Sequence, residues 1–223
     1  MIRAVIFDMY ETLVTLMTGP RCFSGDMAAI AGADVAAFRA AWRATEDARM
    51  LGGMSFETAV RQAMERSGCF SEAAFGRIVG QRRASREIRP ERLHPGILPM
   101  LTALHERGMQ VGLITNCQSE EAEAIRASVL WPYFDAPVLS CEAGVMKPDL
   151  AIFRLCMDAL GVRPAECLYV GDGGSHELEA ARALGMRAVQ AAWYLTGDPI
   201  QPVGRLAEFP AAATPVELLE HLD

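Results

Sequence analysis

Short apolar runs recur along the chain, and between them apolar residues return every three or four positions. Runs in which neighbouring residues are all apolar are typical of strands buried on both faces, whereas the wider spacing is typical of helices. The apolar runs predict five strands, at residues 4–7, 109–114, 134–139, 167–170 and 187–191. Helical spacing is found at residues 97–108, from 119 onward, and at 150–160, 177–184 and 216–222. Strands that alternate with helices predict an α/β fold with a doubly wound parallel sheet.

The segment from about residue 27 to 87 differs, because it contains helical spacings and no strand-like run. Ser55 and Ser71 are plausible helix starts there, and Gly80 is a plausible helix end. Residues 16–26 are expected to form a loop that leaves the first strand. An all-helical block between two α/β segments predicts an inserted helical cap domain. We therefore expect an α/β core at residues 1–15 and 89–223, and a cap at residues 16–88.

Composition narrows the class of protein. The chain has 223 residues, of which 51% are hydrophobic and 22% charged, as in soluble globular proteins. A net charge of −7 argues against a nucleic-acid-binding surface and gives no sign of membrane attraction. No run approaches the length of a membrane span, and the chain begins with a strand pattern, which is not that of a signal peptide. The six cysteines form no CxxC pair, which is typical of reduced thiols. We expect a cytoplasmic monomer or homodimer.

Polar residues follow the predicted strands where an open parallel sheet places its ligands. Asp8 follows the first strand, Thr115 and Asn116 follow the second, and Asp172 follows the fourth. Lys147 precedes a helix whose entry is set by a proline. A nucleophilic carboxylate, a hydroxyl at a helix entrance, a lysine and a second carboxylate are what phosphoryl transfer through an aspartyl intermediate requires.

Asp8 and Asp172 would repel each other if they were adjacent and ionised, unless a cation lay between them. A hard cation with few protein ligands and several waters fits such a pair, so we expect Mg²⁺. Each residue also has an ordinary explanation: Thr115 could end a strand, Lys147 could be a solvated lysine, and Asp172 could lie in a turn. Together, in this order and at these strand ends, the ordinary explanations are improbable.

The string Phe7-Asp8-Met9-Tyr10-Glu11-Thr12-Leu13 resembles the nucleophile signature of the haloacid dehalogenase (HAD) superfamily. The order of the later motifs is also similar, and the resemblance covers about residues 4–189. Its most specific fragments are residues 7–13, 114–116, 147–153 and 170–172. The helical insert resembles the α-helical caps of the subgroup that contains haloacid dehalogenases and small-molecule phosphatases.

The resemblance implies a role for each matched residue. Asp8 would be the nucleophile that forms a covalent ester with a small anionic substrate. Thr115 and Asn116 would orient the substrate anion, and Lys147 would stabilise the intermediate. Mg²⁺ would be held by three groups: the carboxylates of Asp8 and Asp172 and the backbone carbonyl of Tyr10.

The chain departs from the family pattern at several positions. Tyr10 stands where phosphatases usually have a second aspartate that acts as general acid and base, and haloacid dehalogenases carry tyrosine there. Dehalogenases, however, need no metal and usually lack the Gly-Asp pair that this chain keeps at Asp172. His176 and Glu177 replace the usual Asn-Asp; we expect Glu177 to reach a metal-bound water and His176 to lie at a helix entry. Glu11 replaces the commonest glycine, and we expect it to point away from the nucleophile.

A dehalogenase would also need a group that binds the substrate carboxylate. Four arginines of the segment between residues 16 and 88 are candidates for it, although most are expected to be solvated helix residues: Arg21, Arg39, Arg43 and Arg49.

The sequence therefore predicts a hydrolase that acts through a covalent aspartyl intermediate. Mg²⁺-dependent hydrolysis of a small phosphorylated metabolite is the first choice, because Asp172 and the acidic loop imply a metal. A metal-independent 2-haloacid dehalogenase is the alternative enzyme. A binding or regulatory protein on the same fold, with catalysis impaired at position 10, also stays open.

Overall fold

The computed structural model describes residues 1–195 and 203–222. Its core is a six-stranded parallel sheet in the order β3-β2-β1-β4-β5-β6. The strands are β1 (Ala4–Phe7), β2 (Gln110–Thr115), β3 (Ala136–Leu139), β4 (Cys167–Gly171), β5 (Arg187–Ala191) and β6 (Ala211–Ala212). The predicted α/β fold with a doubly wound parallel sheet is confirmed.

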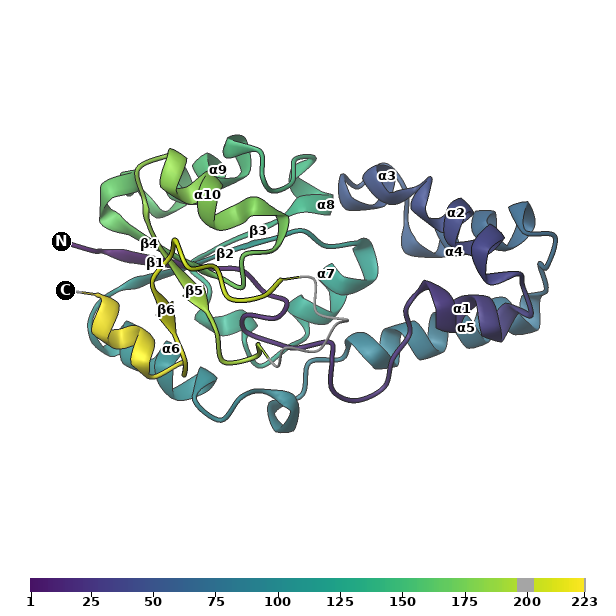
Figure 1. Cartoon of the computed structure of the whole chain (residues 1–223), viewed down its shortest axis with the longest axis horizontal. Coiled ribbons are helices and arrows are strands. Elements are labelled where there is room, and N and C mark those ends of the chain that lie inside the picture. The colour runs from purple at the N-terminus through teal and green to yellow at the C-terminus, as the bar shows by residue number, and fades with distance from the viewer. Residues whose placement is uncertain (196–202, 223) are drawn as a thin grey trace.

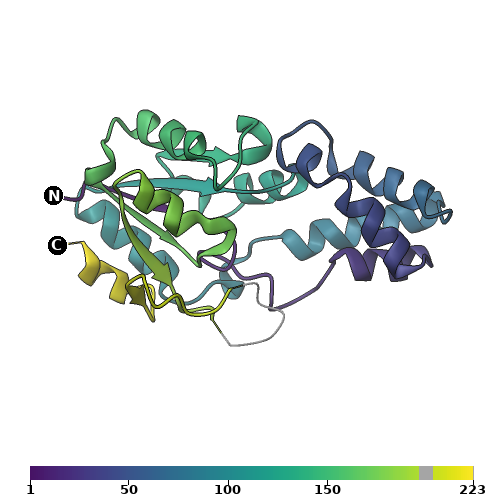
Figure 2. The ribbon, with the colours of Figure 1, turned by 45° about the horizontal axis from the view of Figure 1, so that its top comes forward.

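Helices cover both faces of this sheet (Figures 1 and 2). Side chains of β1 alternate between the two faces: Val5 and Phe7 pack into one hydrophobic cluster, and Ala4 and Ile6 into the other. The first cluster includes side chains of α6 (Ile97–Glu106), α7 (Ser119–Arg126) and η5 (Glu217–His221). The second includes side chains of α9 (Leu150–Leu160) and α10 (Glu177–Ala183). Both faces of β1 are therefore buried, as its unbroken apolar run predicted.

The segment between β1 and α6 folds into five helices that extend from the carboxyl ends of the strands (Figure 1). They are α1 (Ser24–Ala31), α2 (Val35–Arg43), α3 (Glu46–Met50), α4 (Phe56–Arg66) and α5 (Glu72–Arg86). Their buried side chains form a third hydrophobic cluster, separate from the two around the sheet. The hydroxyls of Ser55 and Ser71 accept hydrogen bonds from backbone amides in the first turns of α4 and α5, as N-caps do. We therefore propose the division into core and cap that the sequence predicts.

Several elements differ from the sequence-based expectations. The first cap helix begins at Ser24, inside the segment expected to be a loop. Gly80 was expected to end a helix but lies inside α5. The helix continues because buried side chains on both sides of Gly80, Ile78 and Arg82 among them, hold it against the rest of the protein. This packing outweighs the roughly 1 kcal/mol that a helical glycine costs.

Short elements account for the remaining differences. The two-residue strand β6 and the four-residue helix α8 (Ser140–Ala143) were not predicted, because so few residues give no periodic signal. Four single turns of 3₁₀-helix also lie between the main elements: Pro90–Arg92, Trp131–Tyr133, Pro164–Glu166 and Gly174–His176. Among the described residues, no helix is long and apolar enough to cross a membrane.

Candidate active site

The loop after β1 presents Asp8 at the carboxyl edge of the sheet. The Asp8 amide donates to the carbonyl of Val170 in β4, which extends the strand pairing up to the carboxylate. Asp8 is 6% exposed, and the Thr12 hydroxyl donates to its Oδ2 atom at 3.2 Å. Glu11 adopts a left-handed backbone conformation, with φ of 58°. Its carboxylate accepts hydrogen bonds from the Thr15 hydroxyl at 2.7 Å and from a following amide at 2.8 Å, so Glu11 closes this loop.

Lys147 lies between two carboxylates. Its Nζ atom is 2.5 Å from Oδ1 of Asp8 and 2.5 Å from Oε2 of Glu177. Burial by itself would lower the pKa of Lys147, but the charges of Asp8 and Glu177 raise it above its usual value. Asn116 fixes the backbone of this lysine, because its Oδ1 accepts from the Lys147 amide at 2.8 Å and its Nδ2 donates to the Lys147 carbonyl at 3.0 Å. Asn116, which directly follows β2, therefore holds the backbone of Lys147 in place.

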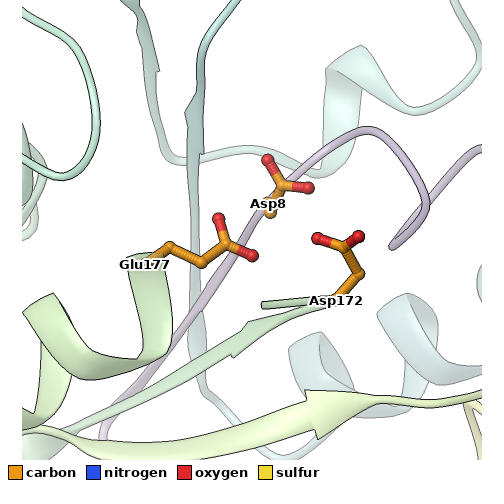
Figure 3. A group of neighbouring side chains, drawn as sticks. All are labelled: Asp8, Asp172 and Glu177. Carbon is orange, nitrogen blue, oxygen red and sulfur yellow. The ribbon is translucent and has the colours of Figure 1, made fainter. Parts of the chain in front are cut away.

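Asp172 and Glu177 complete the acidic side of the site, and Figure 3 shows both carboxylates pointing toward Asp8. Asp172 follows β4, and its Oδ1 accepts from the amide of Gly174 at 2.9 Å. Glu177 is fully buried at the start of α10, where Oε2 also accepts from the Tyr169 hydroxyl at 2.9 Å. Burial, followed by the negative charge of Asp8, raises the pKa of Asp172 to about 6. Burial also raises the pKa of Glu177.

A cation fits this group of side chains in charge and in ligand chemistry. Oxygen atoms of Asp8, Asp172 and Glu177 all lie within 4.8 Å of one another. Three ionised carboxylates with one ammonium carry a net charge of −2, which a divalent cation would balance. Carboxylate oxygens are the ligands that Mg²⁺ prefers. Both oxygens of Glu177 already accept hydrogen bonds, from Lys147, Tyr169 and the Gly173 amide, so Asp8 and Asp172 are the better placed ligands.

Thr115 lies at the end of β2 and is fully buried. Among the described residues, its hydroxyl has no hydrogen-bond partner. A cavity of about 240 Å³ is lined by Asp8, Asn116, Lys147 and Asp172 but not by Thr115. Glu177 also lines this cavity, so of the predicted catalytic and metal-binding positions only Thr115 is not among its lining residues.

Tyr10 and His176 lie differently from the other predicted positions. The Tyr10 side chain lines the cavity, but its buried hydroxyl has no hydrogen-bond partner in the part of the chain that the structure describes. Burial, followed by the negative charge of Glu121, raises the pKa of Tyr10 well above 10. Its hydroxyl therefore keeps its proton. The side chain of His176 is 83% exposed and lies at the entry to α10, as expected.

The four candidate arginines divide into two groups. Arg21, Arg39 and Arg43 are exposed, whereas Arg49 is 2% exposed.

Sequence reasoning missed two further arginines, on α5, that reach across from the cap to the core. Arg82 contacts Glu120 and Glu121 of α7 at 2.8 and 2.9 Å, and Arg86 contacts Glu121 at 2.9 Å. Their spacing of four residues, which places both on one helix face, was the available signal.

Comparison with known proteins agrees with the geometry. A family model described as haloacid dehalogenase-like hydrolase matches residues 2–185. The chain is 33% identical over 134 residues to a phosphoserine phosphatase of Thermus thermophilus. The aligned part covers 60% of this chain and 53% of that protein. The chain is also 31% identical over 121 residues to a phosphoglycolate phosphatase of Rhodospirillum rubrum, which covers 52% and 48%. The chain thus spans about half the length of these curated relatives.

Solved structures share the fold along the whole chain. A 2-haloacid dehalogenase from Pseudomonas syringae superposes with a TM-score of 0.71 at 22% identity, covering 100% of this chain and 98% of that one. A HAD phosphatase from Thermococcus onnurineus superposes with a TM-score of 0.67 at 19% identity, covering 99% and 98%. At 19–22% identity the solved structures support the fold alone. The family assignment rests on the match to the family model. The chain belongs to the haloacid dehalogenase-like hydrolases.

Proposed function

We propose that the protein hydrolyses a phosphate ester of a small molecule through a covalent intermediate on Asp8, with Mg²⁺ held by Asp8, Asp172 and the backbone carbonyl of Tyr10. The observation that carries this proposal is the carboxylate of Asp172, which faces Asp8 and leaves the site with a surplus of negative charge. Without a cation that surplus would repel a phosphate ester. The named activities of the two curated relatives point the same way. A cytoplasmic location and a monomeric or dimeric state stay predictions.

The roles of the residues follow from their contacts. A carboxylate oxygen of Asp8 attacks phosphorus and the ester oxygen leaves, so the phosphoryl group passes to Asp8. Lys147 stays protonated beside Asp8 and balances charge on the transferred group. Asn116, which lines the cavity, binds a phosphate oxygen, whereas Thr115 is not among the residues that line it. Mg²⁺, when bound, neutralises phosphate oxygens. Attack by water on the Asp8 ester then releases phosphate and restores the carboxylate.

No residue in this scheme protonates the leaving group. Tyr10 holds the usual position of the general acid, but its hydroxyl is buried and its pKa is raised. General acid catalysis typically contributes about 10²–10⁴-fold to a rate. Esters whose leaving group needs no proton, such as aryl phosphates, should therefore be hydrolysed faster than alkyl phosphates.

A metal-independent 2-haloacid dehalogenase is the second candidate, and Tyr10 is the residue that favours it. Halide leaves without a proton, so this reaction needs no general acid. Asp172 opposes it, because a second carboxylate beside Asp8 repels the carboxylate of a haloacid when no cation is bound. A binding or regulatory role is the third candidate.

One set of rates tests all three candidates. Purified protein is given phenyl phosphate, ethyl phosphate and 2-chloropropionate, each with millimolar Mg²⁺ or with EDTA. We expect Mg²⁺-dependent release of phosphate, faster from phenyl phosphate. Chloride release that EDTA leaves unchanged would identify a dehalogenase and contradict the proposal. Turnover of none of the three, with Mg²⁺ bound, would favour the binding or regulatory role.

A further inference from the structure

Gln190 is a fully buried polar side chain on β5 and is not among the residues that line the cavity at Asp8. Its Nε2 atom donates to the carbonyl oxygens of Asp172 and Gly204, each at 2.8 Å. Its Oε1 atom accepts from Nη1 of Arg205 at 3.0 Å and from the amide of the next residue at 2.9 Å. These contacts use both amide hydrogens and both lone pairs of the side-chain oxygen.

The contacts also fix which way the Gln190 amide points. If the amide were flipped, its oxygen would face the carbonyl oxygens of Asp172 and Gly204, and its nitrogen would face two N–H donors. All of these hydrogen bonds would then be lost inside the protein, where unpaired polar groups are costly. The Nε2 donor is therefore held against the main chain of Asp172.

Asp172 needs such a restraint because its neighbours repel it. Carboxylate oxygens of Asp8, Asp172 and Glu177 lie within 4.8 Å of one another, so ionised groups push Asp172 away from Asp8 until a cation is bound. Hydrogen bonds from Gly174 and Gln190 oppose this movement. The amide of Gly174 donates to Oδ1 of Asp172 at 2.9 Å, but it belongs to the same turn and would move with it. Gln190 holds the turn from a different strand.

The position of Gln190 is fixed by the sheet. Its backbone lies opposite Gly171, the residue before Asp172, in the pairing of β5 with β4. On the other side, its amide donates to the carbonyl of Pro210 at 2.8 Å, and β5 pairs with β6. A strand paired on both sides moves less than a turn, so Gln190 is a fixed support for the main chain of Asp172.

We propose that Gln190 is a positioning residue for the cation site: by holding the main chain of Asp172, it keeps the Asp172 carboxylate beside Asp8 before a cation binds. The inference rests on the proposed function, in which Asp8 and Asp172 hold Mg²⁺. A carboxylate that is already in place needs no rearrangement to bind the ion, so binding is tighter. Removing a residue that orients a metal ligand typically weakens metal binding about 10- to 100-fold.

Gln190→Met tests this with Mg²⁺ alone as the probe. Methionine is similar in length and uncharged but donates no hydrogen bond. The Mg²⁺ dissociation constant is obtained from the rise in melting temperature with Mg²⁺ concentration, at constant ionic strength. We expect it to be about 10- to 100-fold higher in Gln190→Met than in the wild type. A difference of less than about threefold would overturn the proposal.

Gln190→Glu keeps the assay decisive if the methionine variant does not fold. An ionised glutamate can still accept from Arg205, but it cannot donate to the carbonyl of Asp172. A negative charge added near the site would by itself strengthen Mg²⁺ binding. We nevertheless expect weaker binding, because the lost donor frees Asp172. Equal or tighter Mg²⁺ binding in Gln190→Glu would contradict the proposal.

Ser128→Ala is the control for a general loss of stability. The Ser128 hydroxyl is buried and donates to the carbonyl of Ile125 at 2.7 Å, so this variant also loses a buried hydrogen bond. Both Ser128→Ala and Gln190→Met should unfold at a lower temperature than the wild type in EDTA, but only Gln190→Met should bind Mg²⁺ more weakly. Equally weakened binding in Ser128→Ala would show that the effect follows stability and not the position of Asp172.

Rates separate a failure of this inference from a failure of the proposed function. Phosphate release from phenyl phosphate is followed as Mg²⁺ is raised. Gln190→Met should need about 10- to 100-fold more Mg²⁺ for half of its maximal rate, and the maximal rate should change less. A lower maximal rate with an unchanged Mg²⁺ requirement would contradict the proposal. If the wild type binds Mg²⁺ but hydrolyses no ester, the proposed function fails and the Mg²⁺ titrations still decide the role of Gln190. If the wild type binds no Mg²⁺, both fail.

Discussion

The group of charges around Asp8 and the ion pairs at the junction of α5 and α7 both involve the segment that follows β2, but their charges balance differently. In the first group, three carboxylates share one lysine and leave negative charge in excess. At the junction, Glu120 and Glu121 are paired with Arg82 and Arg86, so opposite charges are equal in number.

This difference separates the reacting groups from a structural contact. A surplus of carboxylates at the end of β1 suits a metal and the phosphoryl group that a metal attracts. The balanced guanidinium and carboxylate groups at the junction hold α5 against α7. The two clusters can therefore be altered independently, and the following experiments use that independence.

Asp8→Asn should have the largest effect, because the amide cannot attack phosphorus. We expect hydrolysis to fall at least about 10³-fold, as when other enzymes lose their nucleophile. The melting temperature should not fall, because the variant removes one of several crowded negative charges. Steady-state rates on phenyl phosphate and a thermal scan measure both. A variant that keeps a tenth of wild-type turnover would rule out a covalent ester on Asp8.

Lys147→Met and Arg82→Met compare the two clusters by stability. Each variant removes the cation from buried carboxylates, and each should lower the free energy of unfolding by about 3–5 kcal/mol. Because Mg²⁺ can replace charge only beside Asp8, it should recover part of the loss in Lys147→Met and none in Arg82→Met. Urea unfolding with and without Mg²⁺ measures this. Equal recovery in both variants would place the metal elsewhere.

The pH dependence of stability should depend on Asp172. Its pKa is raised to about 6 in the folded protein, so the folded state holds a proton that the unfolded state releases near pH 4. Metal-free stability should therefore fall as pH rises from about 4 to 6, by up to about 3 kcal/mol. Mg²⁺ requires the ionised carboxylate, so its stabilising effect should grow over the same range.

Asp172→Asn is the matched variant for this measurement, because it removes the titration and keeps the shape. Its melting temperature should change less between pH 4 and 6 and should not respond to Mg²⁺. If wild type and variant have parallel pH profiles, Asp172 does not titrate in this range.

Tyr10→Phe should have the smallest effect. The hydroxyl has no hydrogen-bond partner within residues 1–195 and 203–222, so its removal should change the free energy of unfolding by less than about 1 kcal/mol and the rate on ethyl phosphate by less than about threefold. Rates on ethyl and phenyl phosphate, compared between variant and wild type, measure it. A fall of a hundredfold on ethyl phosphate alone would show that Tyr10 is the general acid after all.

The sequence predicted the sheet core well, because its strands and helices are long enough to show their periods. The predicted helix at 150–160 and strand at 187–191 agree with α9 and β5 at both ends. The residues around Asp8 could be predicted for a related reason. Each directly follows a strand or precedes a helix, and parallel topology then brings them to one edge.

The cluster at the junction could not be predicted in the same way. Glu120 and Glu121 lie in the first turn of α7, where acidic residues are favoured, but each also contacts an arginine about 35–40 positions earlier. Likewise, the sulfurs of Cys117 and Cys141 lie 3.9 Å apart as free thiols, although no sequence motif links them. Contacts between residues that are far apart in the sequence leave no local periodicity.

The contacts of Arg82 also constrain how the cap can move. Besides Glu120 and Glu121, this side chain donates to the carbonyl of Cys22, so it ties the segment entering the cap as well as α5 to the core. Any movement of the cap away from the core would have to break these bonds or keep α5 beside α7. On another side of the cap, a side chain at Gly52 would lie 1.9 Å from the carbonyl oxygen of Cys141, so this close contact requires glycine.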